Sequence, residues 1–431
     1  MSDSRTLRCF VGNFEFEHRL ALGTGWQPSQ LLRRLNVEMA AAWLAIATDQ
    51  DFILTEAPLP DEFLQQLSTA GLARPRCFTR QQLEKERRTL PADVQLVPWG
   101  WDAASLQLAK QLGLASQLPP LDVVRRVNAR SFSWECERQL GATVRQAARL
   151  ESVAAVAEQL RQLESDETGW VIKSEFGMSA RERILGRGRR LEDSAVAWID
   201  KRVHLGQPVF FEPWLEAVEE VGLQFQIEPH GEIWFLGGTR LWNNPSGQYR
   251  GSSFVSANRL EKEGRFVISA SECQSDGRLD ALLQTIEPER WRPAIASACR
   301  VAANAHELGY FGPLGIDAMC YRSHNGEGEN GMTAWRPIQD SNARWTMGRL
   351  ALGLAERLAD GEVGAWLHVA WNKSGGSSAE DWLAGYRNHL DPRVRLVAMS
   401  PLQLADDPTR CGILYLAAPD AGLLEAAIAQ L

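Results

Sequence analysis

The sequence predicts an α/β protein that is divided into more than one domain. The chain has 431 residues, which is more than a single domain usually holds and enough to bury a large core. Apolar strand-like runs alternate with helical stretches over residues 1–120, and two further runs flank a glycine-rich turn within residues 309–348. The first pattern predicts a parallel sheet, and the second predicts a hairpin.

Composition and charge argue against several classes of protein. Hydrophobic residues make up 45% of the chain and charged residues 23%, as in soluble globular proteins. The formal net charge of -8 argues against a general binder of nucleic acids or membrane surfaces, since both need a positive field. No apolar run approaches the roughly 20 residues that span a bilayer, and the N-terminus lacks a secretory apolar region. We therefore expect neither a nucleic-acid partner nor a membrane partner.

The seven cysteines are scattered through the chain without a C-x-x-C spacing. Neither a zinc site nor a disulfide framework is indicated. We expect reduced, mostly buried cysteines in a cytoplasmic protein.

Residues 1–120 predict a doubly wound parallel sheet, because strands that alternate with helices cross over in one direction. The strand-like runs cover residues 7–14, 51–58 and 94–101, and the helical stretches cover 31–48 and 60–72. Gly23-Thr24-Gly25 is only a fragment of the G-x-G-x-x-G motif, so no dinucleotide site is predicted. Pro119-Pro120 marks the expected end of this domain, since tandem prolines favour an extended linker.

A short apolar run, Trp170 to Lys173, predicts a strand that ends in lysine. The small-residue loop Gly177-Met178-Ser179-Ala180 follows it. Backbone N–H groups of such a loop can approach phosphate oxygens closely, and the lysine supplies a point charge. The pattern indicates a phosphate site, with a basic surface hairpin as the alternative.

The middle of the chain predicts further strands and a polar loop. A strand over residues 208–215 contains Glu212, and two antiparallel strands over residues 223–242 surround a turn at 228–231. Residues 243–251 form a loop with clustered polar groups, among them Gln248, Tyr249 and Arg250. A helix over roughly 288–308 returns the chain to the hairpin.

The hairpin within residues 309–348 carries the strongest chemical signal. Its two strands bring Asp317 beside Asp340 and Asn342. Three oxygen ligands on adjacent strands suit Mg²⁺, which takes carboxylates and completes its octahedron with water and phosphates. Arg344 follows Asn342 by two residues, so we expect it on the same strand face, placed to steady a phosphate. A solvated turn or an Asx cap is the alternative interpretation.

These dispersed motifs, taken together, resemble those of the ATP-grasp ligases. The shared features are an acid on one strand, the acid-x-Asn motif Asp340-Ser341-Asn342 on the next, the strand-borne Lys173 with its loop, and a strand that runs into Glu212-x-Trp214-Leu215. The resemblance covers about residues 120–350. The chain departs from the family at Arg130, where lysine is common, at Ala180, where glycine is frequent, and at Asp340, where glutamate is commoner.

The resemblance implies a domain plan. Residues 1–120 would form a pre-ATP-grasp α/β domain, and residues 121–355 the ATP-grasp domain of two α+β lobes. Its nucleotide lobe would cover about 121–206 and its metal and substrate lobe about 207–355. Residues 356–431 carry no motif and are expected to form a small C-terminal α/β cap.

The resemblance also implies roles for individual residues. Nucleotide contacts are expected from Arg130, Lys173, Gly177, Ser179, Glu212, the backbone at Leu215 and, for the ribose, Glu220. Glu219 is a rival for that last role. Metal ligands would be Asp317, Asp340 and Asn342; substrate contacts would come from Gln248 and Tyr249; catalytic cations would be Arg250 and Arg344.

The function implied by the resemblance is that of a ligase that uses ATP and Mg²⁺, or Mn²⁺. It would activate a small-molecule or peptide carboxylate as an acyl phosphate and join it to an amine or similar nucleophile, with release of ADP and phosphate. No Ser–His or Cys–His pair is visible, so no covalent enzyme intermediate is expected. An ATP-grasp phosphotransferase and a non-catalytic nucleotide-binding scaffold remain alternatives, and a homodimer is compatible with the resemblance.

Overall fold

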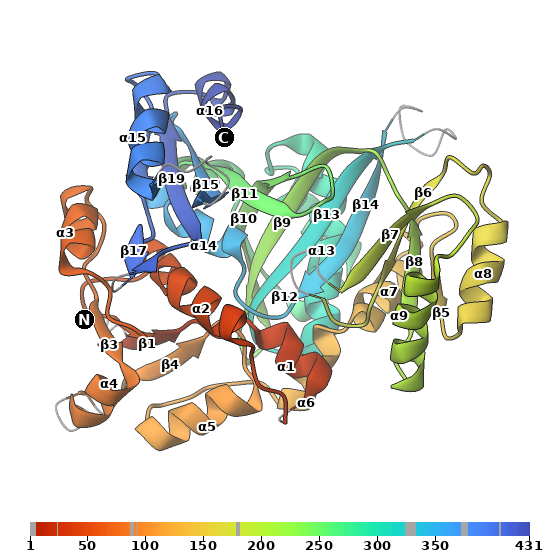
Figure 1. Cartoon of the computed structure of the whole chain (residues 1–431). Coiled ribbons are helices and arrows are strands. Elements are labelled where there is room, and N and C mark those ends of the chain that lie inside the picture. The colour runs from red at the N-terminus through yellow and green to blue at the C-terminus, as the bar shows by residue number, and fades with distance from the viewer. Residues whose placement is uncertain are drawn as a thin grey trace.

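The computed structural model describes residues 6–431 except 24, 87–89, 92, 178–181, 324–332, 372–377 and 405–406. The described chain contains a four-stranded parallel sheet, a four-stranded antiparallel sheet and a large sheet of nine strands that lies between them (Figure 1). No helix in these described ranges is long and apolar enough to cross a membrane.

The N-terminal sheet is parallel, as the sequence predicts, with the strand order β3-β2-β1-β4. Its strands are β1 (Arg8–Val11), β2 (Phe52–Thr55), β3 (Arg76–Thr79) and β4 (Gln95–Pro98). Its helices are α1 (Phe16–Leu22), α2 (Gln30–Met39), α3 (Asp61–Thr69), α4 (Arg80–Glu86) and α5 (Ala103–Leu112). β3 is missing from the predicted strands because it lies at the sheet edge and only Phe78 of its four residues is buried. The predicted helix over 31–48 changes to a 3₁₀ turn after Met39.

A smaller antiparallel sheet follows, with the order β5-β8-β6-β7. Its strands are β5 (Ala148–Leu150), β6 (Gly169–Lys173), β7 (Arg183–Arg187) and β8 (Val209–Pro213). Helices α6 (Leu121–Val127) and α7 (Arg130–Gln139) lead into it, and α8 (Val153–Arg161) and α9 (Asp193–His204) pack on it. Val156 and Ile199 of these helices meet Ile172 and Phe211 in a separate small core. β6 ends at Lys173, as predicted.

The large sheet has the order β14-β13-β9-β10-β11-β15-β19-β16, with β12 also paired to β10. Its first strands are β9 (Ala217–Ile227), β10 (Glu232–Asn243), β11 (Tyr249–Val255), β12 (Phe266–Ser269), β13 (Gly312–Arg322) and β14 (Thr333–Asn342). Helices α10 (Ala257–Glu263), α11 (Ala270–Cys273), α12 (Asp276–Leu283), α13 (Arg292–Glu307) and α14 (Met347–Gly353) accompany them. The predicted hairpin β13–β14 and the predicted pair β9–β10 are both present.

Helix α13 covers one face of this sheet (Figure 1). Its buried positions include Ala294, Ala298, Ala302 and Ala305, which recur every three or four residues. Side chains this small on one face of a helix let it approach the strands closely. The helix therefore supports the strands that carry Asp317 and Asp340 from behind.

The C-terminal region has the expected α/β composition, but its main strands extend the large sheet instead of forming a layer of their own. They are β15 (Val363–Ala370), β16 (Arg395–Ala398) and β19 (Cys411–Ala418), with α15 (Ala379–His389) and α16 (Ala421–Ile428) packed on them. β11 pairs with β15 from Gly251–Leu367 to Val255–Val363. Two short strands, β17 (Gln403–Leu404) and β18 (Asp407–Pro408), pair separately.

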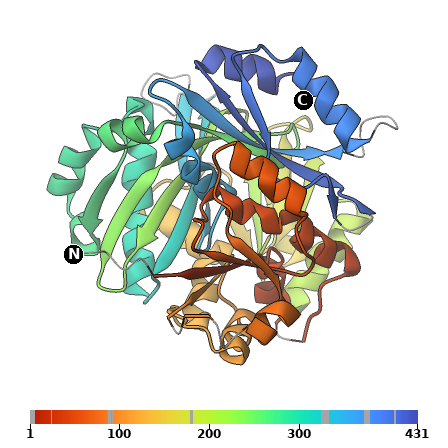
Figure 2. The same cartoon turned by 90° about the vertical axis from the view of Figure 1, so that its left-hand side faces the viewer.

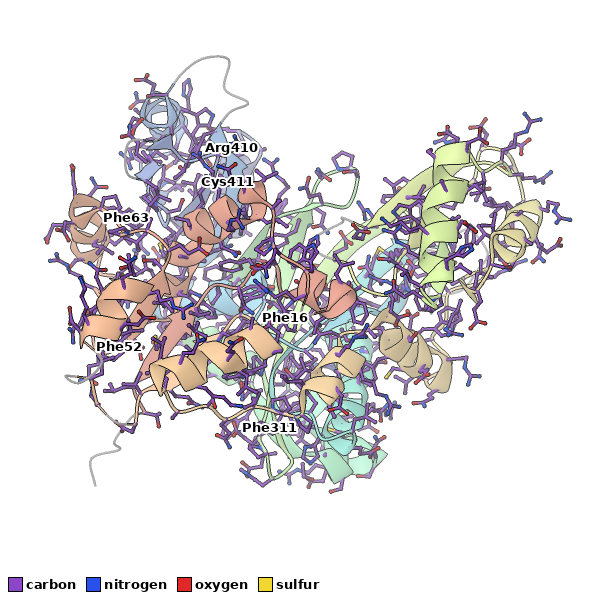
Figure 3. All side chains as sticks on the ribbon, turned by 60° about the horizontal axis from the view of Figure 1, so that its bottom comes forward. Phe16, Phe52, Phe63, Phe311, Arg410 and Cys411 are labelled. Atoms are coloured by element: carbon purple, nitrogen blue, oxygen red, sulfur yellow. The ribbon has the colours of Figure 1, made fainter. Side chains whose placement is uncertain are left out.

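The C-terminal strands approach the N-terminal domain beside the large sheet. The C-terminal segment lies above the N-terminal domain in Figure 2, and Cys411 is labelled close to the N-terminal helices in Figure 3. The backbone N–H of Cys411 donates a hydrogen bond of 3.2 Å to the Glu38 carboxylate at the end of α2. This contact helps to position β19 and α2 on two sides of the cavity described next.

Candidate functional site

A cavity of about 510 Å³ lies where the N-terminal domain, the small sheet and the large sheet meet. Every predicted site residue except Ser179, Glu212 and Leu215 lines it, and these lining residues are Arg130, Lys173, Gly177, Glu220, Gln248, Tyr249, Arg250, Asp317, Asp340, Asn342 and Arg344. Ser179 lies outside the described residues. The structure thus brings together residues that are up to 214 positions apart in the sequence, from Arg130 to Arg344.

Asp317 and Asp340 are direct partners across the β13–β14 ladder. Gly315 pairs with Asn342 in the same register, and the Asn342 side-chain amide donates a hydrogen bond of 3.2 Å to Asp317 Oδ2. Residues that lie opposite each other on adjacent strands present their side chains on one face of the sheet. The predicted proximity of the three oxygen-bearing side chains is therefore present.

The electrostatics at Asp317 favour a cation. Burial, together with the neighbouring Asp340 carboxylate, raises the pKa of Asp317 to about 7. Two carboxylates close to each other in a buried place repel each other, and a divalent cation relieves that repulsion. Carboxylate and amide oxygens are also the donor set that Mg²⁺ prefers. Among the described residues, no cluster of three His, Cys, Asp or Glu side chains suits a metal, and the third oxygen beside the carboxylate pair is that of the Asn342 amide.

Arg130 and Arg344 lie on two sides of this carboxylate pair. Arg130 is the first residue of α7 and its guanidinium contacts the Asp340 carboxylate at 3.1 Å. Arg344 donates a hydrogen bond of 2.9 Å to the side-chain oxygen of Asn342 and forms an ion pair with Glu17 of α1. β14 ends at Asn342, so the expectation that Arg344 continues the same strand face is wrong. The contact with Glu17, and not the strand period, holds it at the cavity.

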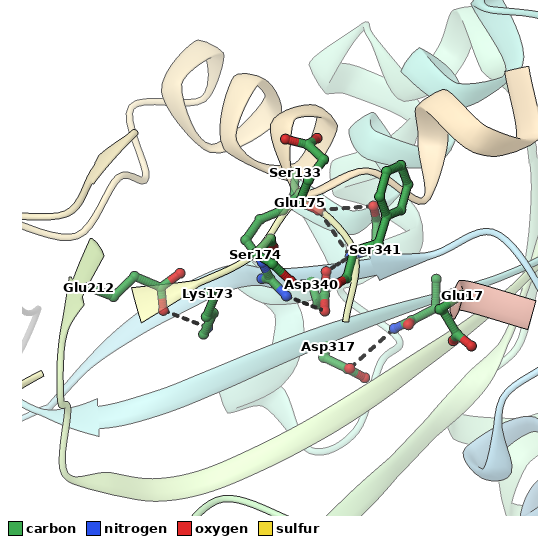
Figure 4. A network of polar contacts seen from close by, with 12 residues as sticks. Glu17, Ser133, Lys173, Ser174, Glu175, Glu212, Asp317, Asp340 and Ser341 are labelled. Atoms are coloured by element: carbon green, nitrogen blue, oxygen red, sulfur yellow. Dashed lines mark hydrogen bonds and ion pairs between the residues drawn. The ribbon is translucent and has the colours of Figure 1, made fainter. Parts of the chain in front are cut away.

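Lys173 belongs to a buried network of charges. Its Nζ lies 2.5 Å from a Glu212 carboxylate oxygen (Figure 4), and Arg336 of β14 contacts Glu212 at 2.7 Å and Glu137 of α7 at 2.7 Å. The Arg336 side chain is only 4% exposed. Burial lowers the pKa of Lys173 to about 8, although Glu212 opposes the shift. Burial alone would raise the pKa of Glu212, but Arg336 and Lys173 outweigh it and hold that pKa well below its usual range.

The network corrects the expectation for the Glu212 side chain. Its carboxylate accepts hydrogen bonds from Arg336 and contacts Lys173, and it does not line the cavity, so it is not available to adenine. Leu215 lies in the connection between β8 and β9 and is half-buried, also outside the cavity lining. An adenine contact here stays a prediction that involves the backbone of the segment alone.

Glu219 and Glu220 point to opposite faces of β9, as consecutive residues of a strand do. Glu220 lines the cavity and accepts a hydrogen bond from the Asn243 side chain. Glu219 lies on the other face, where its carboxylate accepts hydrogen bonds from Arg290 at 2.7 Å and from the Trp291 indole at 3.1 Å. Of these two rivals, Glu220 is therefore the one that a ligand in the cavity can reach.

The polar loop over 243–251 is shorter than predicted, because Asn243 ends β10 and Tyr249 begins β11. Asn244 organises the remaining turn: its side-chain oxygen accepts hydrogen bonds from the backbone N–H groups of Ser246 at 3.1 Å and Gln248 at 2.8 Å. An asparagine that bonds to its own following backbone is a common turn device. Gln248 and Tyr249 are thereby held at the cavity wall.

Several residues that line the cavity were not predicted as site residues. They are Phe14, Glu17, Leu35, Met39 and Trp99 from the N-terminal domain, Glu182 and Arg183 from β7 and its approach, and His368, Val369, Ala370 and Cys411 from the C-terminal strands. None belongs to a motif. Each lines the cavity because segments that are distant in the sequence pack together there.

No protein-family model and no curated protein matches the sequence. The structure nevertheless has the ATP-grasp fold. It is similar to an N5-carboxyaminoimidazole ribonucleotide synthetase in complex with ADP, at a TM-score of 0.51 and 12% identity, over 98% of this chain and 96% of that chain. It is also similar to a carboxyaminoimidazole ribonucleotide synthase of Aspergillus clavatus complexed with ATP, at a TM-score of 0.50 and 12% identity, over 98% and 96% of the two chains. A β-γ-ATP complex of the biotin carboxylase of Campylobacter jejuni matches at a TM-score of 0.50 and 10% identity, over 98% and 89%.

Proposed function

We propose that the chain is an ATP- and magnesium-dependent ligase that activates a carboxylate as an acyl phosphate and joins it to an amine or similar nucleophile, with release of ADP and phosphate. The observation that carries the proposal is the cross-strand pair Asp317–Asp340, which faces the same cavity as Lys173 and Arg130. Two carboxylates and several cations around one cavity suit phosphoryl transfer, which depends on positioning and on charge neutralisation.

In this proposal the nucleotide occupies the side of the cavity near the small sheet. Lys173 and Arg130 bind its phosphates beside Gly177, and Glu220 accepts hydrogen bonds from the ribose. Asp317, Asp340 and Asn342 would hold the magnesium ion, which would neutralise charge on the phosphates. The complexes of the similar structures with ADP and ATP support a nucleotide in this fold.

The carboxylate substrate would approach the terminal phosphate from the side of Arg344. Arg344 is anchored by Glu17 and is therefore pre-oriented, which avoids reorganisation when negative charge develops on the acyl phosphate. Gln248 and Tyr249 would contact the substrate from the start of β11. The nucleophile then displaces phosphate from the acyl carbon.

Binding of a non-hydrolysable ATP analogue tests the proposal directly. We expect isothermal titration calorimetry of the full chain to detect AMP-PNP binding that is strengthened by Mg²⁺, because a metal held by the two aspartates would neutralise charge on the phosphates. Binding that is equal with and without Mg²⁺ would contradict the metal site. No binding under either condition would overturn the nucleotide site as a whole and favour a non-catalytic scaffold.

A matched pair of variants tests the assignment of Glu220. Glu220→Gln is expected to weaken AMP-PNP binding roughly tenfold, as loss of a hydrogen bond to a charged group does, with a change in unfolding free energy below about 0.5 kcal/mol. Glu219→Gln is expected to leave AMP-PNP affinity unchanged and to lower the unfolding free energy by about 1 kcal/mol, because Arg290 is partly exposed and water screens its lost partner. Calorimetry measures the affinities and urea denaturation measures the unfolding free energies. If Glu219→Gln weakened AMP-PNP binding and Glu220→Gln did not, the assignment of Glu220 to the ribose would be wrong.

A further inference from the structure

The part of the cavity where β11 meets β15 contains Arg250, which was expected as a catalytic cation, and His368, to which the sequence assigned no role. β11 and β15 are antiparallel, with Gly251 opposite Leu367. Continuing this register by one residue sets Arg250 opposite His368, and both line the cavity. Side chains of directly opposite residues lie on the same face of a sheet, so the two groups are neighbours.

Arg250 differs from the other cations of the cavity. Arg130 pairs with Asp340, Lys173 with Glu212 and Arg344 with Glu17, and Arg183 donates a hydrogen bond to the backbone carbonyl of Ser246. Within the described ranges of the chain, the guanidinium of Arg250 has neither an ion pair nor a hydrogen bond, although the residue is half-buried. A cation that is partly removed from water without a counter-ion is costly, so this position favours an anionic ligand.

A hydrogen bond from Trp366 holds the neutral His368 ring in one tautomer. The Trp366 indole N–H donates a hydrogen bond of 2.9 Å to His368 Nε2. Because an indole nitrogen can only donate, Nε2 must carry the lone pair, and in the neutral ring the proton therefore sits on Nδ1. Trp366 is fully buried in the core, so the donor is fixed in place.

The second ring nitrogen is available to a ligand. Nδ1 has no hydrogen-bond partner among the described residues. It is also not fully buried, so a ligand in the cavity can reach it. The Tyr249 ring lies edge-on to the imidazole, with 5.4 Å between the ring centroids, and fixes its plane. Burial, and secondly the charge of Arg250, lowers the pKa of His368 to about 4, so the ring stays neutral near pH 7.

We infer that Arg250 and the Nδ1–H group of His368 form a subsite for an oxyanion, a carboxylate or a phosphate, carried by the nucleophilic substrate. Arg250 supplies the charge, and His368 supplies one directional donor without adding a second charge. The subsite lies on the large-sheet side of the cavity, away from Lys173 and the small sheet. His368 is a binding and specificity residue in this scheme and not an acid or a base. The inference rests on the proposed function for the identity of the ligand as a second substrate.

Nitrogen NMR of the histidine rings in the full chain tests the first half of the inference. The chain has seven histidines, and the His368→Asn variant assigns the signal. We expect a neutral ring with the proton on Nδ1 from about pH 5 to about pH 8. In Trp366→Phe, which removes the donor, the ring should become a mixture of tautomers. A proton on Nε2, or an imidazolium ring at neutral pH, would overturn the inference.

Titration with inorganic phosphate and, separately, with acetate tests the second half, each with and without saturating AMP-PNP and Mg²⁺. We expect one or both anions to shift the His368 signal. His368→Leu should weaken this binding roughly tenfold, whereas His368→Asn, whose amide can donate from the position of Nδ1, should stay within about threefold of the wild type. Arg250→Met should abolish it, and His204→Leu on the exposed face of α9 should leave it unchanged. Equal losses in the Leu and Asn variants would show a merely structural role and overturn the inference.

The two anions distinguish a phosphate-bearing substrate from a carboxylate-bearing one. The comparison with AMP-PNP separates this inference from the proposed function. Anion binding at His368 without any nucleotide binding would contradict the ligase proposal but not the oxyanion subsite. Nucleotide binding without a shift of the His368 signal by either anion would contradict the oxyanion subsite but not the ligase proposal.

Discussion

Asp340→Ala is expected to abolish the magnesium-dependent part of nucleotide binding and to reduce any ADP-forming turnover roughly a thousandfold. The variant removes one of the two carboxylates that pair across β13 and β14, and a metal ion supplies several kcal/mol to phosphoryl transfer. The fold should persist, because the Asp340 side chain is 29% exposed and its ion pair with Arg130 is partly open to water. The expected loss of unfolding free energy is about 1 kcal/mol or less.

Calorimetry with AMP-PNP, with and without Mg²⁺, measures the binding part of this prediction. An ADP-release assay measures turnover once a carboxylate and amine pair is found by screening. Asp166→Ala is the matched control, since Asp166 is a well-exposed aspartate in a surface turn outside the cavity. A wild-type rate or an undiminished effect of Mg²⁺ in Asp340→Ala would remove Asp340 from the metal site.

Arg336→Met is expected to lower the unfolding free energy by about 3–5 kcal/mol. The substitution leaves the carboxylates of Glu137 and Glu212 buried with little compensation, and breaking a buried ion pair from one side costs about this much. It also changes the surroundings of Lys173, which keeps Glu212 as its partner. We therefore expect weaker AMP-PNP binding in the same variant, even though Arg336 itself does not line the cavity.

Arg322→Met serves as the control for Arg336→Met, because Arg322 lies on the same hairpin and its ion pair with Glu216 is exposed. Its cost should stay below about 1 kcal/mol. Urea denaturation of the two variants gives the comparison. Similar small losses in both would mean that the buried network adds little to stability. Restoration of stability by Glu137→Gln in the Arg336→Met background would identify the unpaired carboxylate as the cause.

Much of the fold follows from local patterns in the sequence. The alternation of strands and helices at the start of the chain predicted the parallel sheet, and the turn residues around 228–231 predicted the β9–β10 pair. The hairpin pattern also predicted that Asp317 and Asp340 lie side by side, since strands joined by a short connection pair with each other. The edge strand β3 was missed because an exposed edge lacks the apolar signature of a central strand.

The sequence by itself determined which residues could form a phosphate and metal site, because these residues lie in short motifs on strands that pair locally. Only the tertiary structure decided how distant groups combine. It turned Glu212 into the buried partner of Arg336, anchored Arg344 through Glu17, and added His368 to the cavity by pairing β15 with β11. The physical reason is that local sequence sets backbone conformation and side-chain direction, whereas burial and charge pairing depend on which segments pack together.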